Sequence, residues 1–215
     1  MTAKKVRSIK QLSQGVKASA AFFISSIISS GIVYFVTPIY TRLLSANQYG
    51  QAVIYYTWLE LFGICAMFSL SSGIFNNGMI DYPEKRDEYS FSMLILSNII
   101  TFIFSILLIS VYPNIMKLIQ IDFTLIILMV LMFIFQPSYN FWMSRQRFEM
   151  KYKYAVFWSI VCASLSSLIS IISILGCNKN KLYGRLFGAQ IPLLIIYFCF
   201  YIYVAKKSKF KIESK

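Results

Sequence analysis

The chain has 215 residues, of which 58% are hydrophobic, and it carries a formal net charge of +13 at pH 7. It contains no histidine, so the commonest general base and the commonest neutral metal ligand are both missing, and its four cysteines show no metal-binding spacing. The composition therefore disfavours an enzyme, and we expect no metal and no cofactor.

Charged side chains are missing from six long stretches that are rich in Ile, Leu, Phe and Val. At a rise of about 1.5 Å per residue, roughly 20 residues cross a hydrocarbon core of about 30 Å. A spanning segment must satisfy its own backbone hydrogen bonds, so each stretch is expected to be a helix. The sequence predicts an all-α, polytopic membrane protein with transmembrane helices at Ala18–Thr41, Leu61–Ile80, Tyr89–Met116, Phe123–Ser144, Tyr154–Asn178 and Leu186–Ala205.

Most Lys and Arg residues lie in the two terminal tails and in two alternate loops. By the positive-inside rule both termini are predicted to be cytoplasmic. This gives a cytoplasmic tail over 1–17, a membrane lobe over 18–205 and a basic tail or truncated linker over 206–215. The positive charge beside helix ends then reflects topology and contact with anionic membrane lipids, so nucleic-acid binding is not expected.

Polar residues in or beside the first two spans are candidate functional residues, because such residues are costly in a bilayer. Arg42 is predicted to lie near the outer interface, where its side chain reaches water by snorkelling. Ser45 to Gln48 has the S-x-x-Q form of a capping box, which suits the start of the second helix. Glu60 is expected inside that helix, either as a proton- or cation-coupling carboxylate lining a cavity or as a protonated Glu hydrogen-bonded to a neighbouring helix.

The fourth span carries a polar stripe at helical spacing, in which Gln136, Asn140 and Ser144 lead to Arg147. Because bulky amides pack poorly against lipid, the stripe indicates a wet cavity that opens towards the cytoplasm. Stripes of serine and other small residues on the first, second and fifth spans are explained by close helix packing.

The end of the first span resembles, over Thr37–Gly50, the first-helix signature of the bacterial polysaccharide-biosynthesis flippases. These are Wzx-type O-antigen and capsule repeat-unit transporters of the MOP superfamily, which are relatives of the MATE exporters. A second, weaker similarity is the run Arg145-Gln146-Arg147-Phe148 followed by Tyr152. With the six-span spacing, the resemblance covers almost the whole chain. Its structural positions are Pro38, Tyr40, Tyr49 and Gly50.

The resemblance implies a transporter of the bacterial inner membrane that serves O-antigen or capsule assembly. It would move an undecaprenyl-pyrophosphate-linked oligosaccharide from the inner to the outer leaflet by alternating access. Arg145 and Arg147 would then meet the pyrophosphate, because a guanidinium group offers paired donors to phosphate oxygens. Amides of the fourth span would bind sugar hydroxyls. The residues predicted to bind substrate are Arg42, Glu60, Gln136, Asn140, Arg145 and Arg147.

Members of this family usually carry about 12 to 14 spans in two six-helix lobes, so six spans correspond to one MATE-like lobe. We expect a half-length form or fragment that lacks its second lobe or, alternatively, a homodimer that restores twelve helices. Two other classes stay open. One is a six-helix small-molecule transporter or binding subunit of a larger uptake complex. The other is an embedded enzyme using the acidic cluster Asp81–Glu88, for which a solvated loop is the better account.

Overall fold

The computed structural model describes residues 3–68, 70–71, 73–177 and 180–209, of which residues 3–14 and 114–119 are described as backbone only. Within these ranges every regular element is an α-helix, and the all-α prediction is confirmed. The helices are α1 (Ala3–Leu43), α2 (Ala46–Met67), α3 (Gly73–Asp81), α4 (Arg86–Ile119), α5 (Phe123–Phe148), α6 (Tyr152–Gly176) and α7 (Lys181–Lys207).

Five helices among the described residues are long and apolar enough to cross a membrane. Their outward surfaces are apolar as well, since Tyr34 and Phe35 on α1 are each 76% exposed. Exposed apolar surface of this extent is unusual on a soluble monomer and is expected where lipid surrounds the helices. The chain is therefore a multi-pass membrane protein. The candidate spans are Gly15–Leu43, Arg86–Pro113, Phe123–Phe148, Tyr152–Gly176 and Lys181–Lys207.

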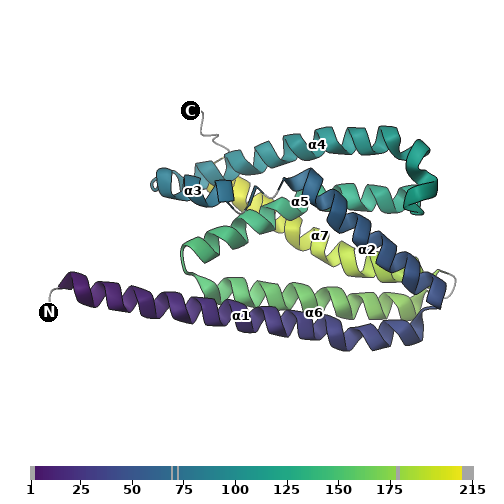
Figure 1. Cartoon of the computed structure of the whole chain (residues 1–215), viewed down its shortest axis with the longest axis horizontal. Helices are drawn as coiled ribbons and strands as arrows, with labels where there is room; N and C mark the ends of the chain where they lie inside the picture. Colours follow the sequence, from purple (N-terminus) through teal and green to yellow (C-terminus); the bar gives the residue numbers. More distant parts are fainter. Residues whose placement is uncertain (1–2, 69, 72, 178–179, 210–215) are drawn as a thin grey trace.

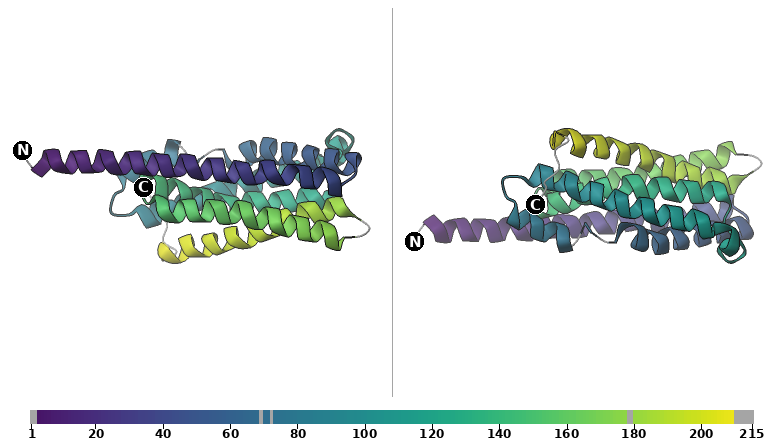
Figure 2. Two further views of the ribbon diagram at one scale, coloured as in Figure 1. Left: turned by 90° about the horizontal axis from the view of Figure 1, so that it is seen from below. Right: turned by 90° about the horizontal axis from the view of Figure 1, so that it is seen from above.

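The helices run up and down along one long axis, and the amino-terminal part of α1 extends beyond the rest of the bundle (Figures 1 and 2). We call the end at which α5 stops and α6 starts the basic end, because Arg145 and Arg147 lie in the last turn of α5 and Lys206 and Lys207 in that of α7. Cations there oppose the negative end of each helix dipole. The opposite end, where α1 stops and α2 starts, is called the far end.

The predicted second span, Leu61–Ile80, is wrong as a continuous helix. Helix α2 begins at Ala46, where Ser45 and Gln48 form the predicted capping box, and it ends at Met67. Phe68 follows in the left-handed conformation with φ 48°, which terminates an α-helix, and a new helix, α3, starts only at Gly73. The sequence between the two helices is rich in serine, which competes with the helical backbone for hydrogen bonds.

Both predicted tails are partly helical in the structure. Residues 1–17 were expected as a tail, but α1 starts at Ala3 and runs without interruption into the first span. Residues 206–215 were expected as a basic tail or linker. Helix α7 extends to Lys207, and residues 210–215 lie outside the described part of the chain, as does Asn178 of the fifth predicted span.

Helices α6 and α7 approach each other closely through glycine. A Cβ atom added to Gly188 would lie 2.6 Å from Ser173 Oγ and 2.9 Å from Ser170 Cα, and one added to Gly184 would lie 2.8 Å from the Ser173 carbonyl oxygen. The Ser170 hydroxyl donates to the carbonyl of Arg185 on α7 at 2.9 Å. Small residues let helix backbones meet in lipid, where van der Waals contact replaces the hydrophobic effect as the main attraction.

Candidate functional site: a polar cavity in the helix bundle

A cavity of about 660 Å³ lies between α2, α5, α6 and α7. This volume falls in the range of small-molecule binding sites. Part of its wall is exposed, since Ile64 borders the cavity and is 66% exposed, so the cavity is open beside α2. Its polar lining residues are Glu60, Ser71, Gln136, Asn140, Ser166 and Gln190.

Glu60 is the acidic residue of this cavity, and it projects from α2 about one turn before Gly63 and Ile64. Its carboxylate has no hydrogen bond or ion pair with any residue that the structure describes. The described contacts therefore do not include the predicted alternative, in which Glu60 is hydrogen-bonded to a neighbouring helix. An exposed carboxylate at the edge of an open cavity is available to a proton, a cation or a hydrogen-bond donor.

Gln136 and Asn140 come from α5, and their spacing of four residues places them on one helix face. Asn140 Nδ2 lies 4.0 Å from Met67 Sδ, which is a weak contact, and the Gln136 amide has no hydrogen bond to described residues. Both amides thus retain donors and acceptors towards the cavity. The structure brings these two predicted residues together with Glu60.

Gln190 of α7 was missed by the sequence analysis. Its side chain is only 2% exposed, and Oε1 accepts a hydrogen bond of 2.7 Å from the Tyr55 hydroxyl. Its Nε2 is buried without a partner among the described residues. A buried amide donor without a partner is costly, so one beside a cavity marks a place where a bound molecule would supply the acceptor. The criterion that selected Gln136, an amide inside an apolar span, applies equally to Gln190.

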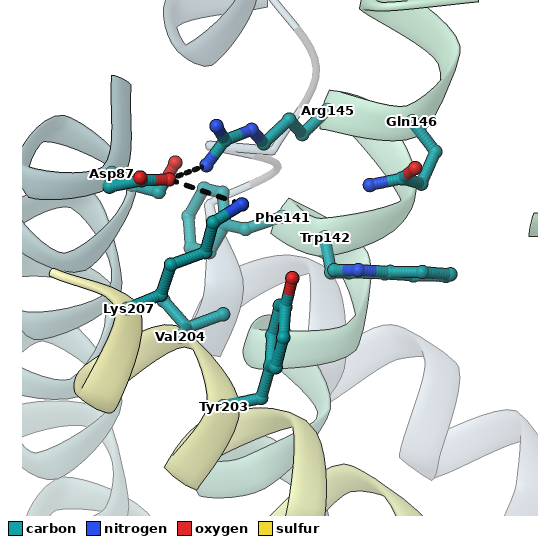
Figure 3. Close-up of a pocket in the computed structure, with 9 residues that line it drawn as sticks. Asp87, Phe141, Trp142, Arg145, Gln146, Tyr203, Val204 and Lys207 are labelled. Atoms are coloured by element: carbon teal, nitrogen blue, oxygen red, sulfur yellow. Dashed lines mark hydrogen bonds and ion pairs between the residues drawn. The ribbon is translucent and has the colours of Figure 1, made fainter. Parts of the chain in front are cut away.

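Arg145 lies outside this cavity, in an ion-pair cluster at the basic end. Its guanidinium binds Asp87 of α4 (Figure 3). It also donates from Nε to Glu149 at 2.8 Å. Lys207 of α7 lies 3.5 Å from Asp87, and Lys151 donates to Glu149 at 2.6 Å. The cluster therefore joins the ends of α4, α5 and α7, and Arg145 already has two carboxylate partners.

The carboxyl group of Glu149 titrates abnormally in this cluster. Burial raises its pKa, but the hydrogen bonds from Lys151 and Arg145 outweigh burial and lower the pKa below its usual value. Glu149 is therefore held ionised, and it stabilises the cluster at neutral pH.

The two other predicted arginines are separate from both groups. Arg147 is exposed, and its guanidinium lies over the ring of Phe22 on α1, with its carbon 5.3 Å from the ring centre. Arg42 is exposed near the far end, where α1 stops. The structure therefore gathers Glu60, Gln136 and Asn140 and leaves the three arginines elsewhere.

A buried arginine that falls between the predicted fifth and sixth spans, Arg185, lies inside α7. Arg185 is 8% exposed, and its guanidinium carbon lies 4.4 Å from the ring centre of Tyr40, 5.0 Å from that of Tyr49 and 5.8 Å from that of Tyr56. Its Nη1 has no partner among the described residues. Three rings around one cation form a cation–π cage that joins α1, α2 and α7. Tyr40 and Tyr49 of the signature segment thus face Arg185, and Pro38 and Gly50 lie in the same segment.

Replacing Tyr40 by leucine is expected to lower the free energy of unfolding by about 1–2 kcal/mol, because a desolvated cation–π contact is lost. Tyr40→Phe keeps the ring and should change stability by less than half as much. The measurement is unfolding in detergent micelles by titration with sodium dodecyl sulfate, followed by circular dichroism. Equal losses in the two variants would show that the hydroxyl group, rather than the ring, carries the contact.

Among the described residues, no group of three His, Cys, Asp or Glu side chains is placed to hold a metal ion. Comparison with family models, curated proteins and solved structures finds no significant match to this chain. Fold and cavity together define the class: an all-α, multi-pass membrane protein with a polar cavity among its helices.

Proposed function

We propose that this chain is one lobe of a Wzx-type flippase that moves an undecaprenyl-pyrophosphate-linked oligosaccharide across the bacterial inner membrane for O-antigen or capsule assembly. The observation that carries the proposal is the cavity in which Glu60, Gln136, Asn140 and Gln190 meet. Amides and a carboxylate suit sugar hydroxyls, which both donate and accept hydrogen bonds. The resemblance of Thr37–Gly50 to the flippase signature supports the same class.

In this proposal α2 and α3 together make the second of six membrane crossings, as a discontinuous helix. Broken helices are tolerated in a membrane where they line a cavity, and they recur at transporter binding sites. Ser71, in the segment between α2 and α3, borders the cavity. The basic end is then cytoplasmic by the positive-inside rule, with both termini on that side.

A single lobe leaves Glu60 exposed beside α2. We propose that a second lobe, either a separate chain or a second copy of this one, faces α2 and completes the substrate path. A substrate with a polar sugar, an anionic pyrophosphate and a lipid tail requires a path that is wet inside and open to lipid at its edge. Two facing lobes provide both conditions.

The double substitution Gln136→Ala with Asn140→Ala is expected to lower transport about tenfold, because each lost hydrogen bond contributes about 0.5–1.5 kcal/mol. The assay measures surface polysaccharide in a bacterial strain that lacks its own flippase and expresses this chain with any second lobe it requires. Gln51→Ala is the matched control, since Gln51 is an exposed amide in the first turns of α2, outside both the cavity and the signature segment.

Full surface polysaccharide in the double variant would remove the cavity from the mechanism. Failure of the unsubstituted chain to restore any polysaccharide, although it is present in the membrane, would contradict the flippase proposal. Accumulation of a small solute that depends on an ATPase partner would instead favour the binding-subunit alternative.

A further inference from the structure

A second hollow, which we call the basic-end groove, lies where α5 stops, α6 starts and α7 stops. It has a volume of about 560 Å³ and is distinct from the polar cavity, with which it shares no lining residue. Its walls are largely aromatic, and they include Trp142, Trp158 and Phe200. The rings of Trp142 and Trp158 have their centres 4.6 Å and 5.2 Å from that of Phe200, so the three form one continuous apolar wall.

Cations stand at the rim of this groove. Lys151 and Lys207 border it, and their side chains are 64% and 42% exposed. Both belong to the ion-pair cluster, in which the cations Arg145, Lys151 and Lys207 share the two carboxylates of Asp87 and Glu149. The cluster therefore retains one positive charge beside the groove, and an anion placed there would meet a net attraction.

The amide of Gln146 also borders the groove. Gln146 is 9% exposed, and its side-chain amide makes no hydrogen bond with the residues that the structure describes, while only its backbone carbonyl accepts a bond, from Lys151 at 2.9 Å. Its neighbours Trp142 and Tyr203 line the same region (Figure 3). An amide that borders the groove without a partner among the described residues can bond to a ligand whose head offers oxygen atoms.

We propose that the basic-end groove binds one anionic phospholipid, with an acyl chain against the aromatic wall and the phosphate near Lys151 and Lys207. Aromatic residues and lysines occupy this arrangement at membrane interfaces, where rings sit at headgroup level and cations meet lipid phosphate. A soluble anion would leave the apolar wall uncovered, and a neutral lipid would leave the surplus charge unpaired. The site is independent of the transport function proposed above.

The test uses fluorescence of the full chain reconstituted in mixed vesicles. The chain has three tryptophans, and Trp58, which stacks on Phe62, does not border the groove. In a Trp58→Phe background, quenching by brominated phosphatidylglycerol and by brominated phosphatidylcholine reports which lipid contacts Trp142 and Trp158. Phosphatidylglycerol should be preferred by about fivefold, since the cluster has one surplus positive charge and a basic residue near an anionic surface contributes about 1 kcal/mol.

Lys151→Ala and Lys207→Ala should each reduce this preference about fivefold, whereas Lys206→Ala should leave it unchanged. Lys206 is the matched control, because it is an exposed lysine in the same last turn of α7 and does not border the groove. Equal quenching by the two lipids in the Trp58→Phe chain would overturn the proposal, and this result needs no lysine variant. An equal loss in Lys206→Ala would also overturn it, since the attraction would then be diffuse.

Discussion

Gly188→Ala is expected to lower the free energy of unfolding by roughly 1–3 kcal/mol, the usual cost of forcing extra volume into a close contact. The added methyl group would lie 2.6 Å from Ser173 Oγ and 2.9 Å from Ser170 Cα, and the second of these atoms is backbone that cannot rotate away. Unfolding in detergent micelles by titration with sodium dodecyl sulfate measures the change.

Gly31→Ala is the matched control for this substitution. Gly31 also lies inside a membrane helix, α1, but a Cβ atom added there would meet nothing within 4 Å. Alanine favours the helix over glycine by about 1 kcal/mol, so this variant should be as stable as the parent or more so. A Gly188→Ala chain as stable as Gly31→Ala would show that α6 and α7 separate at little cost.

Arg145→Gln is expected to destabilise the chain by about 1–3 kcal/mol, because it leaves the carboxylates of Asp87 and Glu149 with fewer partners in a partly buried place. Arg147→Gln, two residues further along α5, should change stability much less. Arg147 is exposed, its guanidinium lies over the ring of Phe22, and it makes no ion pair with a described residue. A similar loss in both variants would mean that overall charge, and not the cluster, matters.

The difference between Arg145→Gln and the parent should also depend on pH. The pKa of Glu149 is lowered in the folded chain, so its contribution to stability is complete above the unfolded value of about 4.3. That contribution is lost as the pH falls through the folded pKa. The parent should therefore lose more stability on acidification than Arg145→Gln does, and the two unfolding curves should approach each other. Curves that stay parallel with pH would contradict the assignment to Glu149.

The apolar stretches predicted the helices well, because the requirement of a bilayer for apolar, self-bonded backbone is local in the sequence. The absence of charged residues misplaced the helix ends, because each predicted span was ended at the first charged residue even where the helix continues. Helix α7 starts at Lys181 rather than Leu186, and Arg185 therefore fell outside the predicted spans although it is buried inside the helix. Charged residues inside spans are the ones that such a search excludes.

The break between α2 and α3 was not predictable from apolarity. Leu61 to Ile80 carries no charge, yet Phe68 adopts the left-handed conformation in its middle. Hydropathy measures the preference of side chains for lipid and contains no information on backbone angles. The serine content of this segment was interpreted as a packing stripe, when it also disfavours a continuous helix.

For the site, the sequence predicted which residues share a face of one helix. It did not predict contacts between residues of two different helices. Gln136 and Asn140 share a face of α5 by spacing alone, and they do line one cavity. The partners of Arg145 and Gln190 lie far along the chain: Asp87 is 58 residues from Arg145, and Tyr55 is 135 residues from Gln190. Helical periodicity carries no signal of such pairs.

The contact between α1 and α6 can form only late in translation, because the two helices lie far apart in the sequence. Figure 1 shows the two helices side by side, and Ser29 Oγ lies 3.4 Å from Ser159 Oγ across their contact. Since α1 leaves the ribosome before α6, it lies in the bilayer without this partner until more than a hundred further residues have been made. Before α6 is present, a serine hydroxyl of α1 can donate a hydrogen bond to a backbone carbonyl in the preceding turn of its own helix. After packing, the same hydroxyl can bond to a side chain of α6. The serines of the first helix can therefore satisfy their own hydroxyl groups in the bilayer until α6 packs against this helix.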